Sequence, residues 1–63
     1  MINTINAALN NETVVILEHG GGYTEVELES HADKDGIWLG HEDLIYWEGI
    51  YKVITSNTIV EFS

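Results

Sequence analysis

Two β-branched runs with a short polar turn between them constrain the fold more than any other feature of the chain. Residues 50–55 and 58–62 are rich in strand formers, and Ser56-Asn57 separates them. This pattern predicts a β-hairpin. We expect its outer edges to be uncovered, and an uncovered apolar edge either pairs with another strand or aggregates. The hairpin therefore predicts assembly with a further chain.

The chain has 63 residues and no cysteine, which limits how it can be stabilised. A chain of this length predicts a single domain, residues 1–63, that buries only about 60% of its extended-chain surface. Such a domain is marginally stable alone. Disulfides and thiolate metal sites are excluded because both need cysteine. Oligomerisation is the expected additional source of stability, and a bound metal is the alternative.

The charge balance is strongly acidic. Eleven carboxylates against two cations, Lys34 and Lys52, give a formal net charge of -9. A field of this sign repels nucleic acid, because phosphate binding depends on lysine and arginine. The acidity either keeps the protein soluble or forms a surface that docks on a basic partner protein.

The sequence contains no cationic leader followed by an apolar stretch, and no apolar run of membrane-spanning length. We therefore expect a cytoplasmic protein that does not contact a membrane.

The order of hydrophobic patterns predicts a mainly β domain. Residues 1–11 carry apolar side chains at helical spacing, residues 13–18 form an apolar run typical of a strand buried on both faces, and residues 23–29 alternate apolar and acidic side chains. Three glycines at 20–22 predict a turn between the two strands.

The second half of the chain is expected to contain a bend, short strands and the terminal hairpin. Residues 30–36 suggest a bend, residues 37–39 a short strand, residues 41–43 a polar connection, and residues 44–47 either a strand or a loop. A short N-terminal helix followed by five strands predicts a strongly bent antiparallel sheet or a partly open barrel.

This order of elements resembles the Sm-like (LSm) family, most closely its very short phage-type members. Residues 54–62 align with the second motif of that family, where Ile54, Ile59, Val60 and Phe62 match, and residues 13–39 resemble its first motif. The resemblance implies an SH3-type partly open barrel and a non-enzymatic subunit without a cofactor. It also implies a homo-oligomeric ring of about five to seven copies.

The resemblance implies that the ring forms through the C-terminal strands. Backbone pairing between the fourth strand of one subunit and the fifth strand of the next builds the ring in that family. The expected interface residues are Ile50, Val53, Ile54, Ile59, Val60 and Phe62.

The residues that bind uridine-rich RNA in that family are largely missing here. Ala32 and Gly36 replace side chains that hydrogen-bond a base, and Thr55 replaces an arginine. Lys34, Asp35, Thr55 and Asn57 remain as the expected RNA or ligand site. The resemblance therefore implies an RNA-associated or scaffolding ring.

A second pattern in the chain has the spacing of a calcium-binding loop. Asp33, Asp35 and Glu42 fall where carboxylate ligands belong, and Gly36 falls at the sharp turn. Histidine at the first position and alternation before the loop favour a solvated acidic turn instead, without a metal.

No other group of residues in the sequence predicts a metal site or a catalytic site. The three histidines lack the spacing of a zinc site, and Ser30 beside His31 lacks a third orienting group, so we expect no catalytic residues. The main alternative to the ring is an acidic protein-interaction module, encoded by a phage, that docks on a basic host protein. A calcium-binding module is a third hypothesis.

Overall fold

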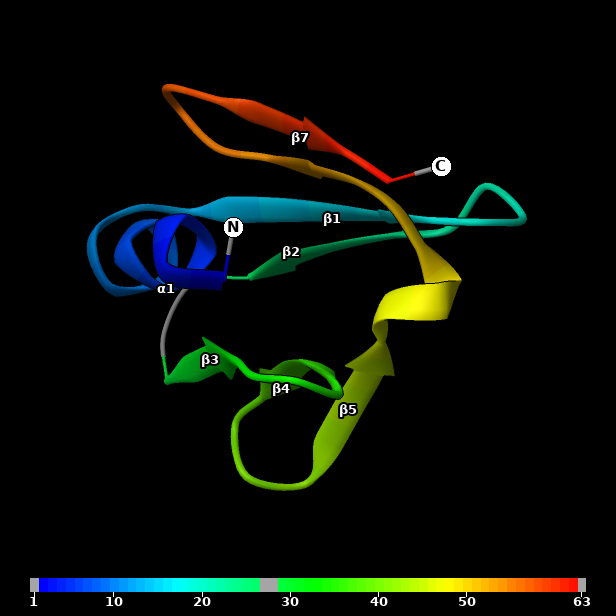
Figure 1. Ribbon diagram of the computed structural model, residues 1–63, viewed down its shortest axis with the longest axis horizontal. Helices are drawn as coiled ribbons and strands as arrows, with labels where there is room; N and C mark the ends of the chain where they lie inside the picture. The colour runs from blue at the N-terminus through cyan, green and yellow to red at the C-terminus, as the bar shows by residue number, and fades with distance from the viewer. Residues whose placement is uncertain (1, 27–28, 63) are drawn as a thin grey trace.

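The computed structural model describes residues 2–26 and 29–62. These residues form α1 (Ile2–Asn11), β1 (Val14–Glu18), β2 (Tyr23–Val26), β3 (Ser30–Ala32), β4 (Gly36–Leu39), β5 (Asp43–Tyr46), the 3-10 helix η1 (Trp47–Gly49), β6 (Ile50–Ile54) and β7 (Ile59–Glu61). Figure 1 shows α1 beside the sheets at one side of the molecule. The predicted mainly β class and N-terminal helix are confirmed for these residues.

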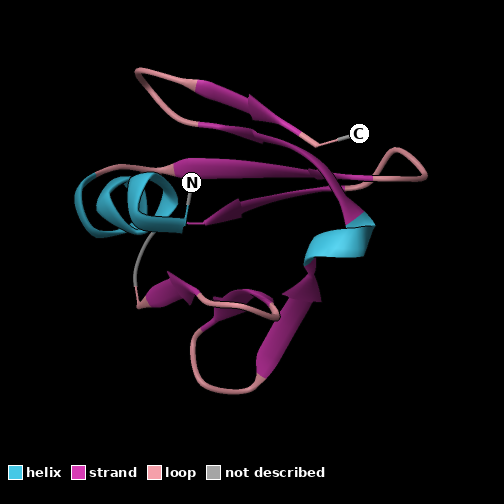
Figure 2. Ribbon diagram, in the orientation of Figure 1, coloured by secondary structure: helices cyan, strands magenta, loops and turns pink. Residues whose placement is uncertain are grey.

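The strands form two antiparallel sheets, as Figure 2 shows. One sheet has four strands in the order β2-β1-β6-β7, and the other has three in the order β3-β4-β5. The described residues therefore hold seven strands rather than the five expected, and they do not close into a barrel. The predicted C-terminal hairpin is confirmed as β6 and β7, which pair from Lys52 with Glu61 to Ile54 with Ile59.

Strand pairing overrides the local preference of one segment and decides between strand and loop for another. The expected bend at residues 30–36 begins with β3, whose residues pair with β4 from Ser30 with Leu39 to Ala32 with Ile37. Serine and alanine are weak strand formers, so the partner strand holds this segment extended. Residues 43–46 form β5 against β4. Positions 27–28 of the expected alternating strand lie outside the described residues.

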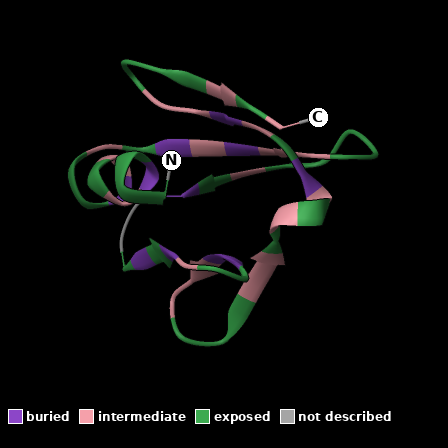
Figure 3. Cartoon of the chain, in the orientation of Figure 1, coloured by how far each residue is buried: buried purple, intermediate pink, exposed green. Residues whose placement is uncertain are grey.

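The core lies between the helix and the two sheets, where Figure 3 shows the buried residues in purple. It consists of Ile5, Leu9, Val14, Ile16, Val26, Ala32, Ile37, Ile50 and Val53. The expectation that β1 is buried on both faces is wrong, because Val14 and Ile16 are buried whereas Val15 and Leu17 are only half-buried. An antiparallel sheet commonly packs one face on the core, and β1 follows that pattern.

Candidate binding surface

The four-stranded sheet has one face on the core and one face pointing away from it. Ile16 and Val53 are paired in register and both are fully buried, so their row faces the core. Side chains alternate between faces along a strand, which places the two neighbouring rows on the opposite side. We call these rows the outer face, and its residues are Val15, Leu17, Tyr23, Glu25, Lys52, Ile54, Ile59 and Glu61.

Apolar side chains form the middle of the outer face. Val15 pairs with Ile54, and Ile54 pairs with Ile59, so three aliphatic residues lie in one row across three strands. Ile59 is 60% exposed, and Tyr23 in the next row is 70% exposed. Large side chains with this exposure on one face offer apolar area to a partner.

Carboxylates flank this apolar row, and Lys52 in the neighbouring row forms an ion pair with one of them. Glu25 ends the row on β2, and Glu61 ends the next row on β7. The Nζ of Lys52 lies 3.3 Å from Oε1 of Glu61 and 5.5 Å from the ring centroid of Tyr51. The outer face therefore combines exposed apolar area with one carboxylate on each of the two edge strands, β2 and β7.

The structure divides the six expected interface residues into two groups. Ile50 and Val53 are 1% and 0% exposed, so their side chains fill the core of their own chain. Their strand β6 lies between β1 and β7, and its two edges are paired within the chain. Ile59 is exposed, while Ile54, Val60 and Phe62 are half-buried. Of these six residues, Ile54, Ile59, Val60 and Phe62 keep side-chain surface that is accessible to another chain.

The structure does not bring together the four residues of the expected RNA or ligand site. Lys34 and Asp35 are exposed in the turn between β3 and β4, whereas Thr55 and Asn57 belong to the turn between β6 and β7. Figure 1 shows these two turns on different sides of the molecule. The Oγ1 of Thr55 accepts the backbone N–H groups of Asn57 and Thr58 at 3.2 and 2.9 Å, so it stabilises its own turn.

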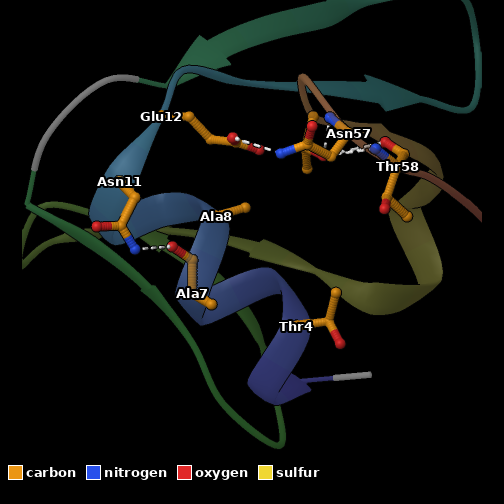
Figure 4. Close-up of a pocket in the computed structure, with 8 residues that line it drawn as sticks. Thr4, Ala7, Ala8, Asn11, Glu12, Asn57 and Thr58 are labelled. Atoms are coloured by element: carbon orange, nitrogen blue, oxygen red, sulfur yellow. Dashed lines mark hydrogen bonds between the residues drawn. The ribbon is translucent and has the colours of Figure 1, made fainter.

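Thr55 and Asn57 instead line a groove of about 270 Å³ between α1 and the β6–β7 turn. Figure 4 shows this groove, and its lining residues are Thr4, Ala7, Ala8, Asn11, Glu12, Thr55, Asn57 and Thr58. No sequence pattern predicted this groove, because the end of α1 and the turn are more than 40 residues apart along the chain.

Glu12 connects the end of α1 to this turn. Its carboxylate accepts hydrogen bonds from the hydroxyl of Ser56, from the backbone N–H of Ser56 at 3.2 Å, and from Nδ2 of Asn57 at 3.5 Å. The hydrogen bond from the Ser56 hydroxyl is the main reason that the pKa of Glu12 lies below its usual value. The Glu12 carboxylate in the groove therefore joins the end of α1 to the β6–β7 turn through hydrogen bonds.

The expected calcium loop is a hydrogen-bonded turn organised by Asp33. Its Oδ1 accepts the backbone N–H groups of Asp35 at 2.8 Å and Gly36 at 3.3 Å, and its Oδ2 accepts the indole N–H of Trp38 at 2.8 Å. These bonds, chiefly the one from Asp35, lower the pKa of Asp33. Both carboxylate oxygens thus have donors, and within residues 2–26 and 29–62 no three metal-ligating side chains converge.

The residues considered for catalysis or zinc binding do not form such a site, and two of the histidine rings contact aromatic side chains. Ser30 is buried and His31 is exposed, so they face opposite sides of β3 and do not form a nucleophile–base pair. The His31 ring stacks on Trp38 with a centroid distance of 6.2 Å, and the His19 ring lies 5.7 Å from that of Tyr51.

The chain matches no family model, and comparisons with characterised proteins and with solved structures found no significant similarity. The resemblance to Sm-like proteins therefore stays a prediction. Among the helices that the structure describes, none has the length and apolar character needed to cross a membrane.

Proposed function

We propose that this protein is a non-enzymatic, acidic interaction module that binds a basic region of another protein. The observation that carries this proposal is the outer face, where the aliphatic row of Val15, Ile54 and Ile59 lies beside Glu25 and Glu61. A partner with apolar residues next to lysine or arginine complements this surface in both respects.

The charge balance favours a basic partner over nucleic acid. The formal net charge is -9, and Lys52 on the outer face is paired with Glu61. Binding to phosphates needs free cations, which this surface does not offer. Binding to a basic protein instead uses the carboxylates to steer the encounter and the apolar row to hold the complex.

Capture from nuclease-treated lysate, followed by reconstitution with the purified partner, tests this function. We expect the captured protein to carry a basic surface and its dissociation constant to rise with salt. The variant Ile59→Glu places a charge in the aliphatic row and should abolish capture, whereas Asn10→Asp on the exposed side of α1 should not. Capture of no protein by the wild type, or equal capture by both variants, contradicts the proposal.

A homo-oligomeric scaffolding ring is the second candidate, and the uncovered edge of β7 is the observation that favours it. Because β6 is enclosed, such a ring would use β7 alone, without β6. Size-exclusion chromatography with light scattering measures the mass in solution, and a monomer at micromolar concentration contradicts the ring. Fluorescence anisotropy with labelled oligouridine at low salt tests the RNA-associated role, which the net charge disfavours.

A further inference from the structure

The edge strand β7 presents a row of backbone groups that have no partner among the described residues. Thr55 donates its backbone N–H to Thr58, and Phe62 donates to Tyr51. Hydrogen-bonded and non-hydrogen-bonded pairs alternate along an antiparallel ladder. These two pairs therefore fix the pattern for the residues between them.

Ile59 and Glu61 lie at the non-hydrogen-bonded positions of this ladder. Their N–H and C=O groups point away from β6, while those of Val60 point toward it. Because β7 ends the sheet, this outward row lies along an open edge, at the top of Figure 1. No proline interrupts β7, so the edge can accept another strand.

One edge of the other sheet, at β3, is covered by a side chain, unlike the edge of β7. The side chain of Asn6 covers β3, because its Nδ2 donates to the Ala32 carbonyl at 2.9 Å and its Oδ1 accepts the Ala32 N–H at 2.7 Å. These are the bonds that a neighbouring strand would make.

We propose that β7 binds an extended segment of the basic partner by strand addition. This inference rests on the proposed function and specifies its binding mode. The added strand exchanges backbone hydrogen bonds with Ile59 and Glu61, and its side chains on the outer face lie directly opposite theirs.

The side chains on β7 define the sequence that the added strand should have. A cationic side chain opposite Glu61 gains an ionic contact, and an aliphatic one opposite Ile59 extends the row of Ile54 and Val15. An antiparallel strand meets Glu61 first and Ile59 two residues later. The expected motif is therefore lysine or arginine, any residue, then isoleucine or valine.

A second copy of this chain fits the edge less well than such a segment. Antiparallel pairing of two β7 strands through the outward groups puts Glu61 of one copy opposite Ile59 of the other. Pairing with the outer edge of β2 brings Glu25 into the same contact. Each copy also carries a formal net charge of -9, which opposes self-association.

The probe is the amidated peptide Ser-Lys-Val-Ile-Ser, titrated into the whole protein and followed by backbone amide NMR. We expect chemical-shift changes and slower hydrogen exchange at the amides of Ile59 and Glu61. Saturation should need about 5 mM peptide, because a single short strand binds weakly. Methylating the backbone nitrogens of the peptide's lysine and isoleucine should weaken binding about tenfold, since those backbone N–H groups donate hydrogen bonds to β7. Methylating the valine nitrogen, which points away, is the matched control.

Two variants of the protein test the same edge by changing β7 instead of the peptide. Glu61→Gln keeps the outward N–H and loses the charge, whereas Glu61→Pro loses both. We expect E61P to bind the peptide more weakly than E61Q. If E61P does not fold, the methylated peptides decide the question alone, because they leave the protein unchanged.

The outcomes separate the binding mode from the proposed function. Equal affinity of the two methylated peptides, or shifts confined to residues away from β7, overturns strand addition even if a basic partner is captured. Equal affinity of a peptide with glutamate in place of lysine removes the charge basis of the proposed function and leaves strand addition standing. A peptide-free oligomer with a slowly exchanging Ile59 amide overturns strand addition in favour of a second copy.

Discussion

Trp47 donates its indole N–H to the backbone carbonyl of Asp33 at 2.9 Å, which ties η1 to the turn between β3 and β4. The backbone N–H of Trp47 also reaches the Asp35 carbonyl at 3.4 Å, and its ring lies 5.5 Å from that of Phe62. One residue thus connects the three-stranded sheet to the end of β7.

Trp47→Phe should destabilise the protein by about 1 kcal/mol, because the ring contact with Phe62 is retained and the indole hydrogen bond is lost. Urea denaturation followed by far-UV circular dichroism measures this change. An unchanged unfolding midpoint would show that the bond to Asp33 contributes nothing to stability.

Gly36→Ala should destabilise the protein by about 3 kcal/mol or more, since backbone atoms cannot move aside cheaply. A Cβ at position 36 would lie 2.1 Å from the Ile45 carbonyl oxygen on β5. Gly22→Ala is the control, because its Cβ would meet only Glu18 Oε2 at 3.8 Å. Thermal melts of both variants compare the sites, and equal melting temperatures contradict this packing.

Asn6→Ala should cost about 1–3 kcal/mol, because it leaves the backbone N–H and C=O of Ala32 without their side-chain partner. It should also open the β3 edge, so the variant is expected to associate at higher concentration. Chemical denaturation and light scattering measure the two effects. Asn3→Ala on the exposed side of the same helix is the control.

The stability of the protein should fall as the pH drops below the usual carboxylate range. The pKa values of Asp33 and Glu12 lie below their ordinary values of 3.8 and 4.5. A lowered folded-state pKa stabilises the protein above the unfolded-state pKa, and this contribution is lost as the pH falls through the folded-state value. Asp33→Asn should therefore be less stable at pH 7 and lose less stability between about pH 5 and pH 2. Urea midpoints across this range measure both slopes, and parallel curves would contradict the role of Asp33.

Ile16→Ala and Ile59→Glu should separate the two faces of the sheet. Ile16 is fully buried, so its truncation should cost about 2–5 kcal/mol. Ile59 is 60% exposed, so I59E should change the free energy of unfolding by no more than about 0.5 kcal/mol while abolishing partner binding. Denaturation curves for both variants check the assignment of faces, and a strongly destabilised I59E would contradict it.

The elements with strong local patterns could be predicted from sequence. The spacing of Ile5 and Leu9 predicted the helix, the apolar run of β1 predicted a strand, and the two β-branched runs predicted the hairpin. In each case the signal lies within a few neighbouring residues, where side-chain periodicity acts.

Only the tertiary structure decided which edges and faces of those elements are available. The sequence could not show that β6 is enclosed by β1 and β7, that Asn6 covers β3, or that Glu12 meets Ser56. The β1–β6, Asn6–Ala32 and Glu12–Ser56 contacts join residues 26 to 44 positions apart, and no local periodicity encodes them. Composition determined the acidic character, while strand pairing determined which carboxylates lie beside the exposed aliphatic row.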